Sequence, residues 1–158
     1  MMDDLSLMRR AISLGRQAAE TGNLPFGALI VRGDEIVSEA SNSVALDGDP
    51  TAHAELKAIR DAARVLATTS LSGLRIFSSG EPCPMCLGAI YWSGLSGLVY
   101  GSSREEAAEA GLTTAFLYEE VSKDPSDRVL PARRLAESEA ADVLRDLVSM
   151  REGERSHD

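Results

Sequence analysis

The sequence predicts a layered α/β domain in which helices cover both faces of a mixed sheet. Segments with helical and strand periodicity alternate along most of the chain. The 158 residues are 44% hydrophobic, which suits one compact domain with a buried core. There is no internal repeat, so we expect a single domain over residues 1–158. Its polar end, residues 151–158, is expected to be a flexible tail.

The amino-terminal part predicts a helix followed by a hairpin. Apolar residues recur at helical spacing among polar neighbours over residues 4–20, which indicates an amphipathic helix. The apolar, partly β-branched stretches 26–31 and 35–40 flank the turn dipeptide Gly33-Asp34. That arrangement predicts a β-hairpin.

The middle of the chain predicts a loop and then alternating helices and strands. Residues 41–51 are rich in Asn, Asp, Gly and Pro, which indicates a loop, and residues 52–66 then read as a helix. Strands are expected at 74–78 and 97–100, with a helix between them that begins after Pro82.

Three further helices are expected in the last third of the chain, at residues 104–110, at 115–121 and from about 135 to 150. The resulting order, α-β-β-α-β-α-β-α-α-α, is the observation that favours a mixed sheet between helices.

Composition argues against a nucleic-acid partner and against a membrane segment. The formal charge is -9, the sequence pI is about 4.7, and no long basic run offers contacts to phosphates. The local cluster of Arg128, Arg133 and Arg134 is interpreted as ordinary solvated surface. No secretory signal and no apolar run long enough to cross a bilayer is present, so we expect a cytoplasmic protein.

The only two cysteines, Cys83 and Cys86, have the spacing C-x-x-C. In a reducing compartment this spacing is typical of metal ligands or a redox pair rather than a structural disulfide. His53 supplies a third ligand of the kind that zinc prefers, and a fourth could come only from His157 in the polar tail. Three protein ligands leave one coordination position for water, which indicates a catalytic Zn²⁺ rather than a structural one.

Glu55 follows His53 by two residues, close enough to exchange protons with the zinc-bound water. We therefore predict Glu55 as the catalytic acid and base. His-x-Glu followed by Pro-Cys-x-x-Cys is the known signature of zinc nucleobase deaminases, and this chain carries both parts in that order.

On these residues the chain resembles the cytidine deaminase superfamily and, within it, the small bacterial guanine deaminases. The stretches that carry the resemblance are PFGA at 25–28, DPTAHAE at 49–55, EPCPMCLGAIYW at 81–92 and AEAG at 108–111. The resemblance implies a three-layer α/β/α fold with a mixed five-stranded sheet and one Zn²⁺ per subunit. It also implies a homodimer in which the C-terminal segment is exchanged and helps close the partner's pocket.

The resemblance further implies conversion of guanine to xanthine and ammonia, with the substrate held by the side chains of Phe26, Asn42 and Trp92 and the backbone at Ala54. Members of this group have an acidic pair where the chain has Thr113-Thr114. Glu119 or Glu120, further along the same segment, is a candidate for the missing acid, and Glu119 is the predicted substrate contact; the alternative for each is ordinary exposed helix surface.

Several functions remain open on the sequence alone. Because a hydroxyl is a weaker acceptor than a carboxylate, guanosine, cytosine and ammeline are alternative substrates. A tRNA adenosine deaminase would share the zinc motif, but the acidic composition argues against it. The non-enzyme alternative is a structural zinc site or a redox C-x-x-C module.

Overall fold

A computed structural model describes residues 2–155 and their side chains as far as Arg151. The chain divides into two compact units, Met1–Val121 and Ser122–Asp158. All the candidate site residues lie in the first unit, which is therefore described first.

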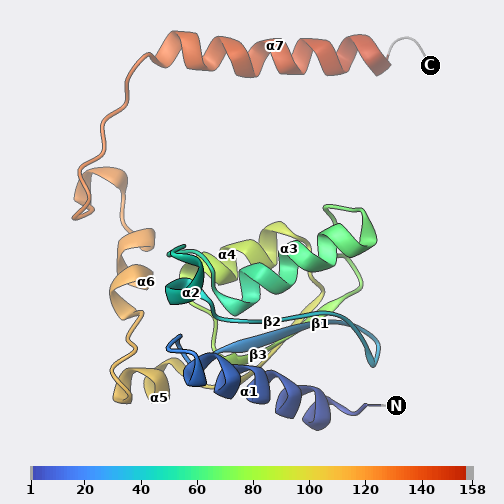
Figure 1. Ribbon diagram of the computed structural model, residues 1–158. Coiled ribbons are helices and arrows are strands. Elements are labelled where there is room, and N and C mark those ends of the chain that lie inside the picture. Colours follow the sequence, from blue (N-terminus) through green and yellow to red (C-terminus); the bar gives the residue numbers. More distant parts are fainter. Residues whose placement is uncertain (1, 156–158) are drawn as a thin grey trace. The chain divides into compact units, whose positions relative to one another are not determined.

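The first unit is built on one mixed sheet (Figure 1). Its strands are β1 (Gly27–Arg32), β2 (Glu35–Ser41), β3 (Arg75–Gly80) and β4 (Gly97–Ser102), in the order β2-β1-β3-β4. The β1–β2 and β1–β3 pairs are antiparallel and the β3–β4 pair is parallel. This confirms the expected hairpin and the mixed character of the sheet.

The expected five strands are a point of correction, because the described residues form a sheet of four. After β4 no further strand is found among the described residues. Ser103 caps the next helix with its side chain, in a capping box with Glu106, and residues 115–122 are helical as well. These local signals direct the chain into helices at the point where a fifth strand would have to begin.

The helices follow the sequence closely. They are α1 (Asp4–Glu20), α2 (Val44–Asp47), α3 (Ala54–Leu66), α4 (Pro84–Trp92), α5 (Arg104–Glu109), α6 (Ala115–Ser122) and α7 (Glu137–Arg155), with a 3₁₀ turn at Pro125–Asp127. The short helix α2 lies within the expected loop at 41–51. The left-handed conformation of Gly48 ends it after four residues, too short a helix for periodicity to reveal.

Helices cover both faces of the sheet, which confirms the three-layer arrangement (Figure 1). Side chains alternate along β1: Leu29 packs with Leu7 and Ala11 of α1, whereas Ile30 packs with Ala58 of α3 on the opposite face. The small alanines of α3 allow this helix to lie close to the sheet. The packing thereby fixes where the amino terminus of α3 points.

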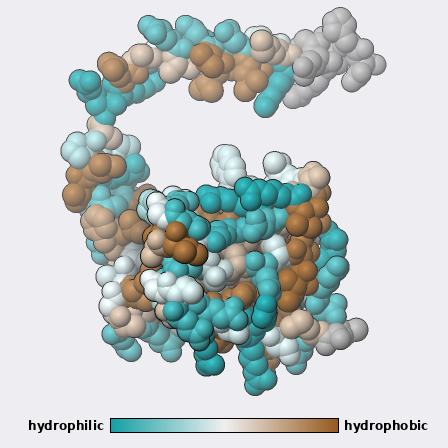
Figure 2. Space-filling view, viewed as in Figure 1, coloured by the Kyte–Doolittle hydropathy of each residue, from teal (hydrophilic) through white to brown (hydrophobic). Residues whose placement is uncertain are grey.

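The second unit contains the 3₁₀ turn and α7, which continues to Arg155, past the expected end near residue 150. Residues 156–158 lie outside the described part of the chain. Apolar side chains remain exposed along α7, at Val143, Leu144, Leu147 and Val148, and appear as brown areas on that helix in Figure 2. No helix among the described residues has both the length and the apolar character needed to cross a membrane.

The packing of α1 predicts a clear contrast between two leucines of one helix. Leu7 is fully buried, whereas Leu5 is 56% exposed. Replacing Leu7 by Ala removes buried methyl groups and leaves a cavity, so we expect the free energy of unfolding to fall by about 2–5 kcal/mol. The matched control, Leu5→Ala, is expected to cost less than about 1 kcal/mol. Equal losses in urea denaturation would contradict the orientation of α1.

Candidate metal centre and pocket

Three side chains meet at a point where they can hold one metal ion. His53 Nδ1 lies 3.6 Å from Cys83 Sγ and 3.4 Å from Cys86 Sγ, and the three ligand atoms are all within 4.8 Å of one another. Tetrahedral Zn²⁺ with Zn–S of about 2.3 Å and Zn–N of about 2.0–2.1 Å places nitrogen and sulfur about 3.6 Å apart. The residues therefore fit zinc, with His53 binding through Nδ1.

Two helix starts position these ligands. His53 is the N-cap of α3 and Cys83 is the N-cap of α4, and neither side chain caps its helix. Both are extended in the backbone, and Pro84 pre-sets the first turn of α4. The side chains are therefore free to bind a metal, while the positive ends of two helix dipoles favour thiolate at this place.

The charges of the ligand groups are coupled. Hydrogen bonding with Cys86, and next with His53, lowers the pKa of Cys83 to about 4 although the thiol is buried. The same contact with Cys83 raises the pKa of Cys86, and burial adds to that rise. Hydrogen bonding to Cys83 also raises the pKa of His53. Because Zn²⁺ needs thiolates and a neutral imidazole, it displaces these protons and binds more tightly as the pH rises.

Glu55, in the first turn of α3, is buried beside the ligands. Its Oε1 accepts a hydrogen bond of 3.0 Å from the Ser78 hydroxyl, and its Oε2 lies 3.5 Å from Cys86 Sγ. Burial raises the pKa of the Glu55 carboxyl, and the Ser78 hydrogen bond opposes that rise only in part. Ser78 thus holds one oxygen, and the other is directed to the ligand cluster.

The ligands open onto a pocket of about 300 Å³. It lies at the end of the sheet where β1 begins and β3 ends, and its walls come from six segments of the first unit. The lining residues are Leu24, Phe26, Asn42, His53, Glu55, Glu81, Cys83, Arg104, Ala107, Gly111, Leu112, Thr113 and Thr114.

Phe26 has its place in this wall because Gly80 lacks a side chain. A Cβ at position 80 would come within 2.8 Å of the Phe26 ring. The backbone carbonyl of Phe26 accepts a hydrogen bond of 2.9 Å from the amide of Asn42, so the two predicted pocket residues lie next to each other at the open end of the hairpin.

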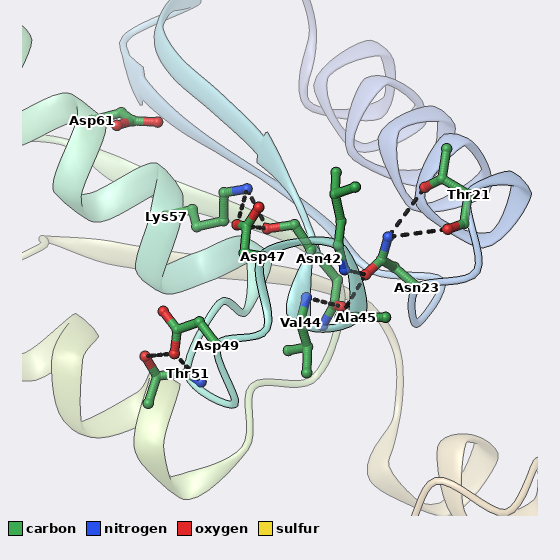
Figure 3. A network of polar contacts seen from close by, with 12 residues as sticks. Thr21, Asn23, Asn42, Val44, Ala45, Asp47, Asp49, Thr51, Lys57 and Asp61 are labelled. Carbon is green, nitrogen blue, oxygen red and sulfur yellow. Dashed lines mark hydrogen bonds and ion pairs between the residues drawn. The ribbon is translucent and has the colours of Figure 1, made fainter.

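Asn42 is only 2% exposed, and a polar network holds it in place (Figure 3). Its Oδ1 accepts a hydrogen bond from the amide of Val44. Asn23, at the end of α1, accepts from the amides of Ala45 and Leu46 and so anchors the same turn. Within residues 2–155 the Asn42 Nδ2 group has no hydrogen-bond partner, which leaves a donor for a ligand.

The other predicted contacts are not among the residues that line the pocket. Ala54 is fully buried in the core between α3 and the sheet. Trp92, the last residue of α4, is 94% exposed, and Glu119 is exposed on α6. None of the three lines the pocket formed by the described residues.

Sequence patterns did not identify Leu24, Glu81 or Arg104 as pocket residues. Glu81 directly precedes the Pro-Cys motif, which was a usable signal. Arg104 opens an ordinary exposed-looking helix, and no sequence feature distinguishes it from other helix-start residues.

The ligand geometry predicts that a single sulfur decides metal binding. We expect Cys86→Ser to lower bound zinc from about one ion per chain to a small fraction, because a hydroxyl does not replace a thiolate ligand. Met85→Ser changes the neighbouring, more exposed sulfur and should leave the zinc content unchanged. Elemental analysis of both purified variants makes the comparison. Full zinc occupancy in Cys86→Ser would show that Cys86 is not a ligand.

Comparisons with known proteins agree with this geometry. Residues 1–102 match the family described as the cytidine and deoxycytidylate deaminase zinc-binding region. The guanine deaminase of Bacillus subtilis is 41% identical over 131 residues, which cover 82% of this chain and 84% of that protein. The crystal structure of guanine deaminase from the same organism superimposes with a TM-score of 0.90 at 37% identity, covering 94% of this chain and 95% of that one.

A tRNA-specific adenosine deaminase of Bacillus subtilis is also similar. It is 34% identical over 120 residues, which cover 76% of this chain and 74% of that protein. The likeness thus includes relatives that act on different substrates.

Proposed function

The chain belongs to the cytidine and deoxycytidylate deaminase family of zinc-dependent hydrolytic deaminases, and we propose that its substrate is free guanine, hydrolysed at C2 to xanthine and ammonia. The observation that carries this proposal is the buried Glu55 carboxylate beside a three-ligand zinc site, inside a small pocket. The likeness to guanine deaminase over most of both chains supports guanine in particular.

The pocket suits a free base better than a larger substrate. About 300 Å³ is at the lower end of the range for small-molecule sites. Phe26 offers an apolar surface for the ring, and the Asn42 amide offers a buried donor beside it. The net charge of -9 repels the phosphates of an RNA substrate, which weighs against the tRNA alternative.

His53, Cys83 and Cys86 would hold Zn²⁺, which would lower the pKa of water to about 7 and so make hydroxide available near neutral pH. Glu55 moves the protons. Its Oε2, free of Ser78 and facing the ligand cluster, accepts a proton from the water, passes it to the ring and assists the departure of ammonia. Its raised pKa suits a carboxylate that must both take up and return a proton.

The central test is ammonia release from guanine. The parent enzyme should form xanthine and ammonia in equal amounts, and Glu55→Ala should lower kcat by about 10²–10⁴-fold because general acid–base catalysis is lost. Zinc should remain bound in that variant, since Glu55 is not a ligand.

Glu109→Ala, an exposed carboxylate of α5 outside the pocket, serves as the matched control and should keep parental turnover. Turnover of Glu55→Ala within about tenfold of the parent would refute the proton-transfer role. Guanosine, adenine, cytosine, cytidine and ammeline are assayed alongside. If one of them is deaminated and guanine is not, the substrate assignment fails while the deaminase class stands.

We further propose that the enzyme is a cytoplasmic homodimer. Both cysteines are free thiols within the metal site, which suits a reducing compartment. Trp92 and Tyr91 are 94% and 79% exposed at the end of α4, and Leu144 and Leu147 of α7 are exposed as well. Such apolar surface is typical of a protein interface, and α7 is the candidate for the exchanged segment. In such a dimer, Trp92 and Glu119 remain candidates for substrate contact.

The dimer proposal predicts that the charge of one residue at α4 changes the oligomeric state. In sedimentation velocity at micromolar concentration we expect the parent to be dimeric and Trp92→Glu to shift towards monomer, because a carboxylate is costly to bury at an interface. Val65→Glu places the same charge on an exposed apolar residue of α3 and should stay dimeric. A monomeric parent, or a fully dimeric Trp92→Glu, would contradict this interface.

A further inference from the structure

Arg104 lies in the pocket wall, and the proton-transfer steps make no use of it. It is the first residue of α5 and lines the pocket together with Thr113 and Thr114. Among the pocket-lining residues of the described chain it is the only one with a permanent positive charge. A guanidinium in a small pocket favours a ligand edge that carries hydrogen-bond acceptors.

The guanidinium of Arg104 is fixed from two sides. The Glu81 carboxylate accepts a hydrogen bond of 3.0 Å from the Arg104 backbone amide, and its other oxygen forms an ion pair with Nε at 3.0 Å. The Nε contact is close but not aligned as a hydrogen bond. The Tyr118 ring lies 4.3 Å from the guanidinium carbon, and the Tyr118 hydroxyl is itself tied to the Pro82 carbonyl at 2.8 Å. The side chain is therefore pre-organised.

The outer nitrogens of this guanidinium are available. Within residues 2–155, Nη1 and Nη2 make no hydrogen bond. Glu81, the acid on this side of the pocket, has its charge offset by Arg104 itself. Thr113 Oγ1 accepts a hydrogen bond from the amide of Ala115 and still has its own proton to donate. The unused donors on this wall are therefore the outer nitrogens of Arg104 and the Thr113 hydroxyl.

A wall of donors requires acceptors on the substrate edge that faces it. Guanine has such an edge in O6 and N7, and an arginine fork matches that pair of acceptors with two parallel hydrogen bonds. The 2-amino group that leaves, and the N1–H donor, belong to the other side of the ring. Turning O6 and N7 to Arg104 thus leaves C2, on the opposite edge of the ring, for Glu55 and the zinc ligands that line the same pocket.

We propose that Arg104 determines substrate specificity by pairing with the O6/N7 acceptor edge of guanine. This inference rests on guanine being the substrate. It assigns selection of the 6-oxo group to a residue on α5, apart from the residues that carry out the hydrolysis. A ring with an amino group at position 6 presents a donor to the same fork and is disfavoured, and a ring with hydrogen there loses one of the two bonds.

The test compares three purines that carry the same leaving 2-amino group and differ at position 6. Guanine has oxygen there, 2-aminopurine has hydrogen and 2,6-diaminopurine has an amino group. The kcat/KM of each is measured for the parent, Arg104→Met and Arg104→Lys. Because the intrinsic reactivity of each ring is the same for all variants, the change in the ratio of two substrates reports the side chain alone.

For Arg104→Met we expect the guanine preference over 2-aminopurine to fall about tenfold, with 2-aminopurine itself changed less than about threefold. The preference for guanine over 2,6-diaminopurine should fall further, because the 6-amino group no longer faces the donors of the Arg104 guanidinium. Arg104→Lys keeps the charge without the fork and should lie between the two. Arg64→Met, which removes an exposed arginine outside the pocket, should keep all parental ratios.

Unchanged ratios in Arg104→Met overturn the inference, as does an equal loss for all three purines, which would indicate a purely structural role for the Glu81 pair. Both results leave the guanine assignment intact, because the parent still hydrolyses guanine. If the parent itself does not turn over guanine, the proposed function fails, and the inference that rests on it fails too.

Discussion

The structure depends on two helices that begin at the same point. His53 and Cys83 are the N-cap residues of α3 and α4, and each has its carbonyl bonded into the first helical turn, by Lys57 and by Leu87 respectively. The ligand positions are therefore set by backbone geometry and not by flexible side chains alone. α3 in turn lies close to the sheet through small residues such as Ala58. The packing of α3 on the sheet therefore also fixes the position of the metal ligand at its start.

The hairpin supplies the substrate side of the same arrangement. Phe26 and Asn42 flank the paired ends of β1 and β2, and the hydrogen bond between their backbones extends that pairing by one step. Asn23 adds a second anchor from the end of α1, since it holds the amides that follow Asn42 (Figure 3). A helix cap and a strand end therefore restrict one amide donor, which lowers the entropy lost when a ligand is bound.

Features that depend on local sequence signals were predictable, whereas features that depend on long-range contacts were not. His53, Cys83 and Cys86 were predictable because metal ligands need particular side chains at short, fixed spacings, and helix starts are marked by local residues. The number of strands was not predictable in this way. The fifth strand was expected from the resemblance alone, and strand pairing at a sheet edge depends on contacts between residues far apart in the sequence. Arg104 was missed for a similar reason: its place in the pocket comes from contacts with Glu81 and Tyr118, which lie 23 residues before and 14 after it.

The zinc ligands and Glu55 differ from Arg104 and Thr114 in how strongly the fold restricts substitution. The ligands and Glu55 are tied to helix starts and the core, and they fall within the region shared with the family, which ends at residue 102. Arg104 and Thr114 lie beyond it, on α5 and on a connection that turns through the left-handed Gly111 and forms no sheet pairing. Substitutions there alter groups that line the pocket and leave the ligand residues themselves unchanged. The groups on this wall can therefore vary without replacing the residues of the hydrolytic centre.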